Sequence, residues 1–322
     1  MITSHPSLPT AKGDFIEQHA TYTAKPFLKW VGGKTQLLDE LAYSITTDFQ
    51  RMQATTYVEP FIGGGAFFFW IMQTMRGIRH AVINDINEDL IKTYTTVQQH
   101  PAQLILALRK MQDAYLPLSH EARTDYYLHI REKYNTKQSS DVCTAAMLIF
   151  LNRTCFNGLY RVNSKGAFNV PHGRYLNPKI CDAETIMADH NVLQGVTILC
   201  GDFQQTLRYA DTHTLFYLDP PYKPVTTTAA FTSYDKEGFD DRAQGRLHAF
   251  CDSINSRGSK FILSNSDVRS QNGDPFFDNL YDTYWVRRVQ ATRMVNCNAA
   301  KRGKINELLI TNFHNKAQTN HE

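Results

Sequence analysis

The residue pattern with the clearest chemistry is Asp219-Pro220-Pro221-Tyr222, which directly follows an apolar run typical of a buried strand. The lone pair of an amino group on an aromatic ring is delocalised, so acceptors on its N–H bonds are needed to expose it. The Asp219 carboxylate and the Pro220 carbonyl can supply two acceptors, and the prolines stiffen the turn that carries them. Tyr222 offers a face on which a base can stack. We interpret these four residues as a catalytic site for an exocyclic amine, with an ordinary turn as the alternative.

A second pattern suits a nucleoside cofactor. The segment Glu59-Pro60-Phe61-Ile62-Gly63 carries a predicted strand into a glycine turn, where the backbone can approach a ligand closely. Asp85 lies 22 residues after Gly63, at the end of the next predicted strand. A carboxylate there can hold the two hydroxyls of a ribose. Because the full GxGxxG pattern is absent, a tight turn followed by a helix-capping acid is the alternative.

Gly201-Asp202-Phe203 follows a later predicted strand. Asp202 can accept a hydrogen bond from the amino group of a cofactor adenine, and Phe203 can stack on its ring. The equal alternative is a helix N-cap followed by a core phenylalanine.

The segment Lys29–Thr35 ends in Gly-Lys-Thr, as a phosphate-binding P-loop does. A P-loop also needs a glycine at position 28, which is Leu28 here, and a preceding strand that the sequence does not show. We therefore reject a P-loop nucleotidase. Lys34 remains as a cation that can meet a carboxylate, and Trp30 as a ring that can stack.

These motifs need a scaffold that brings strand ends together. Strands are predicted near 55–59, 80–84, 196–200, 214–218 and 260–264, and two later runs, 282–290 and 305–313, are expected to pair as a closing hairpin. Helices are expected near 66–75, 87–99 and 240–257. The order predicts an α/β fold with a doubly wound, Rossmann-like sheet, which binds ligands at the carboxyl ends of its strands.

An insertion separates the second and third predicted strands. Residues 101–152 have helical periodicity, whereas residues 152–179 are rich in Asn, Gly, Arg and aromatics and indicate a hairpin with loops. We predict that residues 26–100 and 195–313 form the catalytic domain and that residues 101–194 form an inserted, mainly helical subdomain carrying a β-hairpin. Residues 1–25 and 314–322 are expected to be flexible ends.

The distribution of charge indicates phosphate binding more clearly than its total does. The formal net charge is only +3, but residues 151–180 hold five Lys or Arg and residues 283–304 hold six, with no acid in either stretch. Such stripes are typical of nucleic-acid contact, with a solvated basic face as the alternative. The six cysteines form no CxxC pair, so no zinc site is predicted. With no membrane-length apolar run and no secretory signal, we expect a cytoplasmic protein.

Together these motifs resemble the Dam-type (D12 class) DNA adenine-N6 methyltransferases. The matching blocks follow the family's order over most of residues 26–313: FLKWVGGKTQLL, YVEPFIGGGAFFF, INDINEDLI, FLNRTCFNGLYRVNSKGAFNVPHGRY, CGDF, FYLDPPY and RGKINELLITNF. Several blocks in one order are far more specific than any single block.

The resemblance implies that the Rossmann-like domain is a methyltransferase domain and that the insertion recognises the target in duplex DNA. It implies a cofactor, S-adenosylmethionine, bound by Trp30, Lys34, Asp85 and Asp219, with Glu59, Phe61 and Gly63 lining the same pocket. The implied reaction flips an adenine out of the duplex, forms no covalent enzyme intermediate and involves no metal.

The same resemblance implies which residues of the hairpin meet the DNA. Arg161 matches an arginine that reads a guanine, Leu159 and Pro171 match residues that touch thymine methyl groups, and Phe156 matches an aromatic wedge with Asn157 beside it. Arg153 and Arg174 of the basic stripe complete the predicted DNA contacts.

Relatives with GATC and GATATC targets share this hairpin style, so GATC is the predicted target and GATATC the alternative. The sequence departs from the family at Thr154-Cys155, in the glycine-rich turn and in the N-terminal extension. A cytosine-N4 enzyme would begin the catalytic motif with Ser, and an RNA or protein-glutamine enzyme with Asn, in place of Asp219. An inactive DNA-binding protein is disfavoured by the intact motif. We expect a monomer, and the sequence leaves open a cognate restriction endonuclease.

Overall fold

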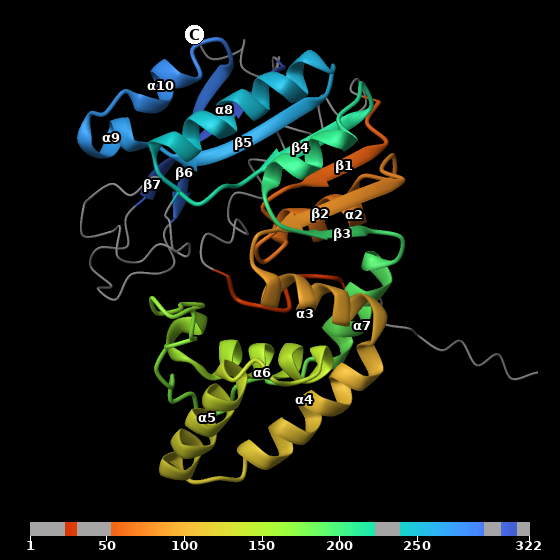
Figure 1. The fold of residues 1–322 in the computed structure, drawn as a ribbon, viewed down its shortest axis with the longest axis vertical. Helices are drawn as coiled ribbons and strands as arrows, with labels where there is room; N and C mark the ends of the chain where they lie inside the picture. Colours follow the sequence, from red (N-terminus) through yellow and green to blue (C-terminus); the bar gives the residue numbers. More distant parts are fainter. Residues whose placement is uncertain (1–22, 31–52, 223–238, 293–303, 314–322) are drawn as a thin grey trace, which may run out of the picture.

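The computed structural model describes residues 23–30, 53–222, 239–292 and 304–313 (Figure 1). Within them, seven strands form one sheet in the order β3-β2-β1-β4-β5-β7-β6. The strands are β1 (Thr56–Glu59), β2 (His80–Asp85), β3 (Thr197–Cys200), β4 (Thr214–Leu218), β5 (Lys260–Ser266), β6 (Trp285–Thr292) and β7 (Lys304–Thr311). This is a doubly wound, Rossmann-like α/β sheet, which confirms the predicted fold class.

The pairing of the strands defines one functional edge. β1 lies between β2 and β4 and is parallel to both, and β3 and β5 extend the parallel part on either side. β7 runs antiparallel to both β5 and β6, so the predicted closing hairpin is confirmed. Because β1, β2 and β4 share one direction, their carboxyl ends meet at one edge of the sheet.

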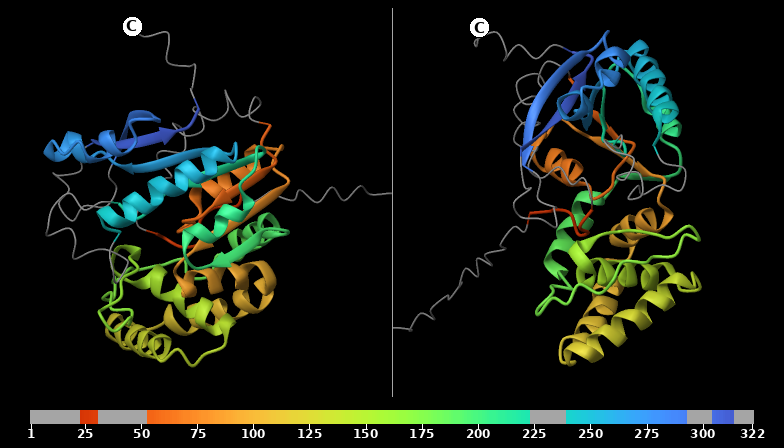
Figure 2. Two further views of the ribbon diagram at one scale, coloured as in Figure 1. Left: turned by 45° about the horizontal axis from the view of Figure 1, so that its top comes forward. Right: turned by 90° about the vertical axis from the view of Figure 1, so that its left-hand side faces the viewer.

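Helices cover both faces of the sheet (Figure 2). They are α2 (Ala66–Thr74), α3 (Glu88–Gln99), α7 (Ala183–Leu193), α8 (Asp241–Ser256), α9 (Val268–Asn272) and α10 (Phe276–Leu280), with a 3-10 turn, η2 (Phe203–Tyr209). The alternation along β4 explains the two layers: Leu215 and Tyr217 belong to the core under α2 and α3, whereas Phe216 and Leu218 belong to the core under α8. A strand buried on both faces needs the continuous apolar run that the sequence has there.

The insertion forms a helical unit on one side of the sheet (Figure 1). It contains α4 (Pro101–Tyr115), α5 (His120–Asn135), α6 (Asp141–Thr154) and the 3-10 turn η1 (Phe156–Gly158). α6 packs against α3, α4 and α5, and every residue from Ala145 to Leu151 is buried, so α6 is the central helix of this unit. One continuous core joins it to the sheet through α3.

The segment after α6 folds back on itself as a sparse hairpin. Only two isolated antiparallel bridges hold its arms, Cys155 with His172 and Val162 with Phe168. At its tip, the Asn163 side-chain oxygen accepts from the Lys165 and Ala167 amides, both at 3.0 Å, and so closes the turn. None of the helices in the described ranges is long and apolar enough to cross a bilayer.

Candidate functional site

Three carboxylates meet where β1, β2 and β4 end. Glu59 and Asp85 are the last residues of β1 and β2, and Asp219 follows β4. The strand order runs outward in opposite directions from β1 and β4, and this reversal is where open α/β sheets bind ligands. Burial raises the pKa of Glu59 well above its usual range, and the negative charges of Asp219 and Asp85 raise it further. A cation at this edge would be stabilised by all three groups.

Asp219 is held in place from the neighbouring strand. The hydroxyl of buried Ser264, on β5, donates to Asp219 Oδ1 at 2.9 Å. Pro220 is buried and Pro221 exposed, and the Tyr222 hydroxyl donates to Glu307 Oε2 on β7 at 2.8 Å. The predicted catalytic segment is therefore braced at both ends by strands that follow it in the chain.

The glycine turn after β1 is built around Asp85. Asp85 Oδ2 accepts from the Gly63 amide and Oδ1 from the Asn87 amide, both at 3.0 Å. Burial raises the pKa of Asp85, although the hydrogen bonds from Asn87 and Gly63 oppose that rise. Gly63 has φ 46°, and a Cβ there would lie 3.0 Å from Cδ1 of Trp30. The structure thus brings Trp30, Gly63 and Asp85 together, as a cofactor pocket requires.

Asn84 joins this turn to the loop after β3. Its side-chain nitrogen donates to the carbonyls of Pro60 and Gly201, both at 2.9 Å, and its oxygen accepts from Gln205 at 2.8 Å. The next residue but one, Ile86, has 63% of its surface exposed beside Asp85 and presents an apolar face at the strand edge. Neither residue was singled out from the sequence.

Asp202 and Phe203 form the contacts expected of a helix N-cap followed by a core phenylalanine, the alternative interpretation of this motif. Asp202 Oδ1 accepts from the Gln204 amide at 2.9 Å as the N-cap of η2, and Oδ2 pairs with Arg246 at 2.8 Å. Phe203 is only 5% exposed, and the Arg246 guanidinium covers its ring at 5.2 Å. Phe61, half-buried and 5.3 Å from Phe203 between ring centroids, is the more accessible aromatic.

The hairpin presents several of the predicted DNA contacts outward. Phe156 is 45% exposed, Asn157 next to it is exposed with φ 56°, and Pro171 is exposed. Arg161 is exposed and held by Asn169, which accepts from Nε through its side chain at 2.8 Å and from Nη2 through its backbone at 3.2 Å. Leu159 is half-buried.

Arg153 is oriented differently from the rest of the basic stripe. Its Nη2 donates to the Phe27 carbonyl at 2.8 Å, and burial lowers the pKa of the guanidinium. The geometry therefore gives Arg153 a structural contact with the N-terminal segment. Arg174 is exposed, with φ 56°.

Part of the second basic stripe is neutralised within the fold. Arg288 Nη2 binds Asp278 at 2.7 Å and its Nε binds buried Asp267 at 3.2 Å. Two acids that lie outside the stripe in the sequence thus neutralise one of its positive charges. Lys34, Arg293, Lys301 and Arg302 lie outside the described residues, as do residues 1–22 of the predicted N-terminal end and all of the predicted C-terminal end, 314–322.

The departure at Thr154-Cys155 has a packing explanation. Cys155 is fully buried, its thiol donates to the Leu159 carbonyl at 3.2 Å, and burial raises its pKa to about 12. A Cβ on Gly173 would lie 2.5 Å from the Cys155 carbonyl oxygen, so the two arms of the hairpin touch here. The thiol is a core group and contributes no chemistry to the site.

Comparison with known proteins agrees with this geometry. Residues 30–295 match the family described as D12 class N6 adenine-specific DNA methyltransferase. The chain is 44% identical over 292 residues to a type II methyltransferase, M.MjaIII, of Methanocaldococcus jannaschii, covering 90% of this chain and 99% of that protein. It is 38% identical to the type II methyltransferase M1.LlaDCHI of Lactococcus lactis subsp. cremoris, covering 90% and 96%. It is 33% identical to a DNA adenine methylase of Vibrio cholerae, covering 88% and 95%.

Proposed function

The chain belongs to the D12 class of N6 adenine-specific DNA methyltransferases, and on that premise we propose that it methylates the adenine of GATC sites in duplex DNA with S-adenosylmethionine as donor. The observation that carries the proposal is the meeting of Glu59, Asp85 and Asp219 at the carboxyl ends of parallel strands beside Trp30. When bound, the cofactor supplies an electrophilic methyl group on a cationic sulfur. The pKa values of Glu59 and Asp85 are raised by desolvation, and such carboxylates favour a cationic ligand because its charge stabilises their ionised form.

Each wall of the pocket has a distinct role in this proposal. Asp85, oriented by the Gly63 and Asn87 amides, accepts from the ribose hydroxyls. The backbone at Gly63 lets the cofactor approach closely, and Trp30 closes one side of the same turn. Phe61 and the exposed side chain of Ile86 offer apolar surface for the adenine ring, and Lys34 is proposed to meet a carboxylate.

At the reacting centre, the protein positions and polarises the amine. The Asp219 carboxylate accepts a hydrogen bond from one N6–H group of the adenine, and the Pro220 carbonyl accepts a hydrogen bond from the other. The nitrogen lone pair then points at the methyl carbon. The donor would supply the methyl carbon for the new nitrogen–carbon bond, its sulfur would leave as a neutral thioether, and the N6 proton would pass to solvent. Ser264 fixes the orientation of Asp219, and the bond from Tyr222 to Glu307 fixes the ring on which the flipped base stacks.

The hairpin is the proposed reader of the target. Asn169 holds one edge of the Arg161 guanidinium, and the Nη1 and Nη2 groups carry donors for O6 and N7 of a guanine. Phe156 is exposed where a wedge would enter the base stack. Arg174, which is also exposed, is proposed to meet a phosphate, whereas Arg153 is left out because it faces Phe27. We propose that the enzyme works as a cytoplasmic monomer.

A panel of duplexes tests the function directly. The full chain is incubated with S-adenosylmethionine tritiated on its methyl group and with duplexes carrying GATC, GATATC, either site with 2-aminopurine at the adenine, or a scrambled site. Label in N6-methyladenine of the GATC duplex alone is expected. Label in the GATATC duplex alone would show that GATATC is the target. Label in neither duplex, despite cofactor binding, would contradict the proposal that this DNA is the substrate.

A further inference from the structure

One aromatic ring lies between the two binding surfaces of the proposed enzyme. Tyr160 is 7% exposed, and its ring stacks on Trp30 with centroids 5.0 Å apart and planes 24° from parallel. Trp30 packs against the glycine turn of the cofactor pocket. Tyr160 itself lies between Leu159 and Arg161, the residues proposed to read bases. A movement of either surface must therefore be accommodated at this stacked pair.

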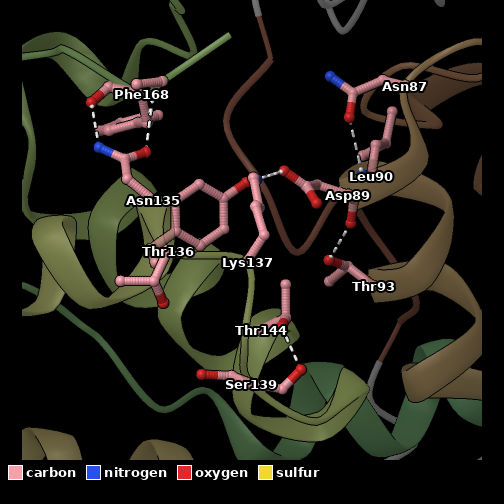
Figure 3. Close-up of polar contacts among 12 residues, drawn as sticks. Asn87, Asp89, Leu90, Thr93, Asn135, Thr136, Lys137, Ser139, Thr144 and Phe168 are labelled. Carbon is pink, nitrogen blue, oxygen red and sulfur yellow. Dashed lines mark hydrogen bonds and ion pairs between the residues drawn. The ribbon is translucent and has the colours of Figure 1, made fainter.

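The hydroxyl end of Tyr160 touches the cofactor side as well. Tyr160 forms side-chain hydrogen bonds with Asn87 and Tyr134, and burial raises its pKa. Asn87 is the residue whose amide donates to Asp85 Oδ1 at 3.0 Å, and its side chain caps α3 by accepting from the Leu90 amide at 3.0 Å (Figure 3). Tyr160 thus contacts both Trp30 and the residue that orients the ribose-binding acid.

An ionic cluster with a buried acid and an exposed lysine supports the other side of this arrangement. Asp89, on α3, accepts from Tyr134 and Lys137, and the Lys137 ammonium lies 4.1 Å from the centroid of the Tyr134 ring. Figure 3 shows Lys137 facing Asp89, next to Asn135. Asn135 holds the other arm of the hairpin, because its oxygen accepts from the Phe168 amide at 2.8 Å and its nitrogen donates to the Phe168 carbonyl at 3.0 Å.

A second brace ties the same parts together without Tyr160. Buried Asn152, on α6, accepts from the Lys29 amide at 2.8 Å and donates to the carbonyls of Lys29 at 2.8 Å and Gly158 at 2.9 Å. This brace links the backbones of the two segments, so the hairpin keeps its place if the Tyr160 ring is removed. The stacked ring then determines only how strongly a movement of Trp30 is coupled to a movement of the base-reading residues.

We propose that Tyr160 is a positioning residue that couples occupancy of the cofactor pocket to engagement of target DNA by the hairpin. The proposal rests on the proposed function, since it takes Trp30 as a cofactor wall and Arg161 as a base reader. Coupling between two sites is reciprocal, so each ligand changes the affinity for the other by the same factor. That factor is the quantity that Tyr160 controls.

The test measures this factor in the full-length protein. The dissociation constant of S-adenosylhomocysteine is determined by calorimetry with and without the duplex that accepts label in the assay above, and the ratio is the coupling factor. Tyr160→Leu is expected to reduce the ratio at least fivefold. Tyr160→Phe keeps the stacked ring and loses only the hydroxyl bonds, so a reduction of about twofold is expected. Tyr126→Leu, on α5 among Tyr115 and Phe150, is the matched control and should leave the ratio unchanged.

The outcomes separate the two proposals. A general loss of packing would weaken both ligands alike and leave the ratio unchanged, which would overturn the positioning role. A wild-type ratio of one would overturn it too. Wild-type protein that binds neither ligand would instead contradict the proposed function. If Tyr160→Leu does not fold, Tyr160→Met decides, because it also removes the stacked ring but keeps more of the side-chain volume: a ratio equal to that of the wild type would overturn the positioning role.

Discussion

At the scale of single residues, Ser264 is the group that orients the proposed catalytic acid. Its hydroxyl is buried and donates to Asp219 Oδ1 at 2.9 Å. A hydrogen bond to a charged group contributes about 1.5–3 kcal/mol, and each 1.36 kcal/mol of barrier is about tenfold in rate. We therefore expect Ser264→Ala to lower kcat about tenfold with little change in KM for S-adenosylmethionine. Steady-state kinetics on the duplex that accepts label measure both kcat and KM.

Ser259 provides a matched control for that substitution. It is also buried, it lies just before the opposite end of β5, and its hydroxyl donates to the Asp211 carbonyl at 2.7 Å, far along the strand from Asp219. Ser259→Ala should change stability without changing kcat of the folded protein. Equal kcat values for the two variants would contradict the role given to Ser264.

The site residues that the sequence predicts and those that it does not predict differ in whether local sequence or long-range strand pairing positions them. Asp85 and Asp219 end predicted parallel strands, and parallel strands place such ends at one edge. Ser264 and Glu307 reach the site only through the registers of β5 and β7, which long-range pairing decides. The inward orientation of Arg153 was equally hidden, because a charge in the sequence does not show that its side chain donates to the Phe27 carbonyl.

At the scale of elements, the turn from β1 into α2 depends on Gly65. It is the N-cap of α2 with φ 72°, and a Cβ there would lie 2.5 Å from the buried Tyr94 hydroxyl. A left-handed conformation costs a residue with a Cβ about 1–2 kcal/mol, and the contact adds to this. Gly65→Ala should therefore lower the free energy of unfolding by at least about 1 kcal/mol, measured by urea denaturation.

The same substitution in α8 should have the opposite sign. Gly245 lies inside that helix, and a Cβ there meets nothing within 4 Å. Alanine is favoured over glycine in a helix by about 1 kcal/mol, so Gly245→Ala should stabilise the protein. Stabilisation by both substitutions would show that the glycine turn is not under the constraint described.

Elements with strong local signals were predictable, and those defined by packing were not. β4 lies at residues 214–218 as expected, because its run is apolar throughout and ends at Asp219. The short helices α9 and α10 were not predicted, since five-residue helices have no periodicity that a sequence can show. The hairpin has only two bridges between its arms. The side chains of Asn135 and Asn163 form the hydrogen bonds to its backbone that a longer strand ladder would otherwise supply.

At the scale of the whole molecule, side chains of three helices hold the segment that carries Trp30. Gln73 of α2 exchanges two hydrogen bonds with Ala24, Asn152 of α6 does the same with Lys29, and Asp189 of α7 accepts from the Lys25 amide at 3.0 Å. The cofactor wall therefore depends on the junction between the sheet and the insertion. A change in the ionisation of a residue at that junction should therefore change the free energy of unfolding of the whole chain.

Asp189 is the ionisable group through which pH acts there. It is fully buried, and burial raises its pKa to about 8, with the Lys25 amide and nearby Arg153 opposing the rise. The folded state thus holds a proton that the unfolded chain releases near the ordinary pKa of an aspartate, 3.8. Stability from this group is complete below that value and falls as pH rises towards about 8. Asp189→Asn mimics the protonated acid, so it should raise the melting temperature by an amount that grows from pH 3.8 up to a pH of about 8, and change it little below pH 3.8.

Asp182, close by at the N-cap of α7, should respond in the opposite sense. Burial alone would raise its pKa, but hydrogen bonds from Lys179 and Thr185 bring it below the ordinary value. Its contribution to stability is therefore present at neutral pH and is lost as pH falls through the lowered pKa. Asp182→Asn should lower the melting temperature at neutral pH and have a diminishing effect towards strongly acidic pH. Parallel pH profiles for the two variants would show that the titration of Asp189 does not control the junction, whereas diverging profiles would place that control at the carboxylate that holds Lys25.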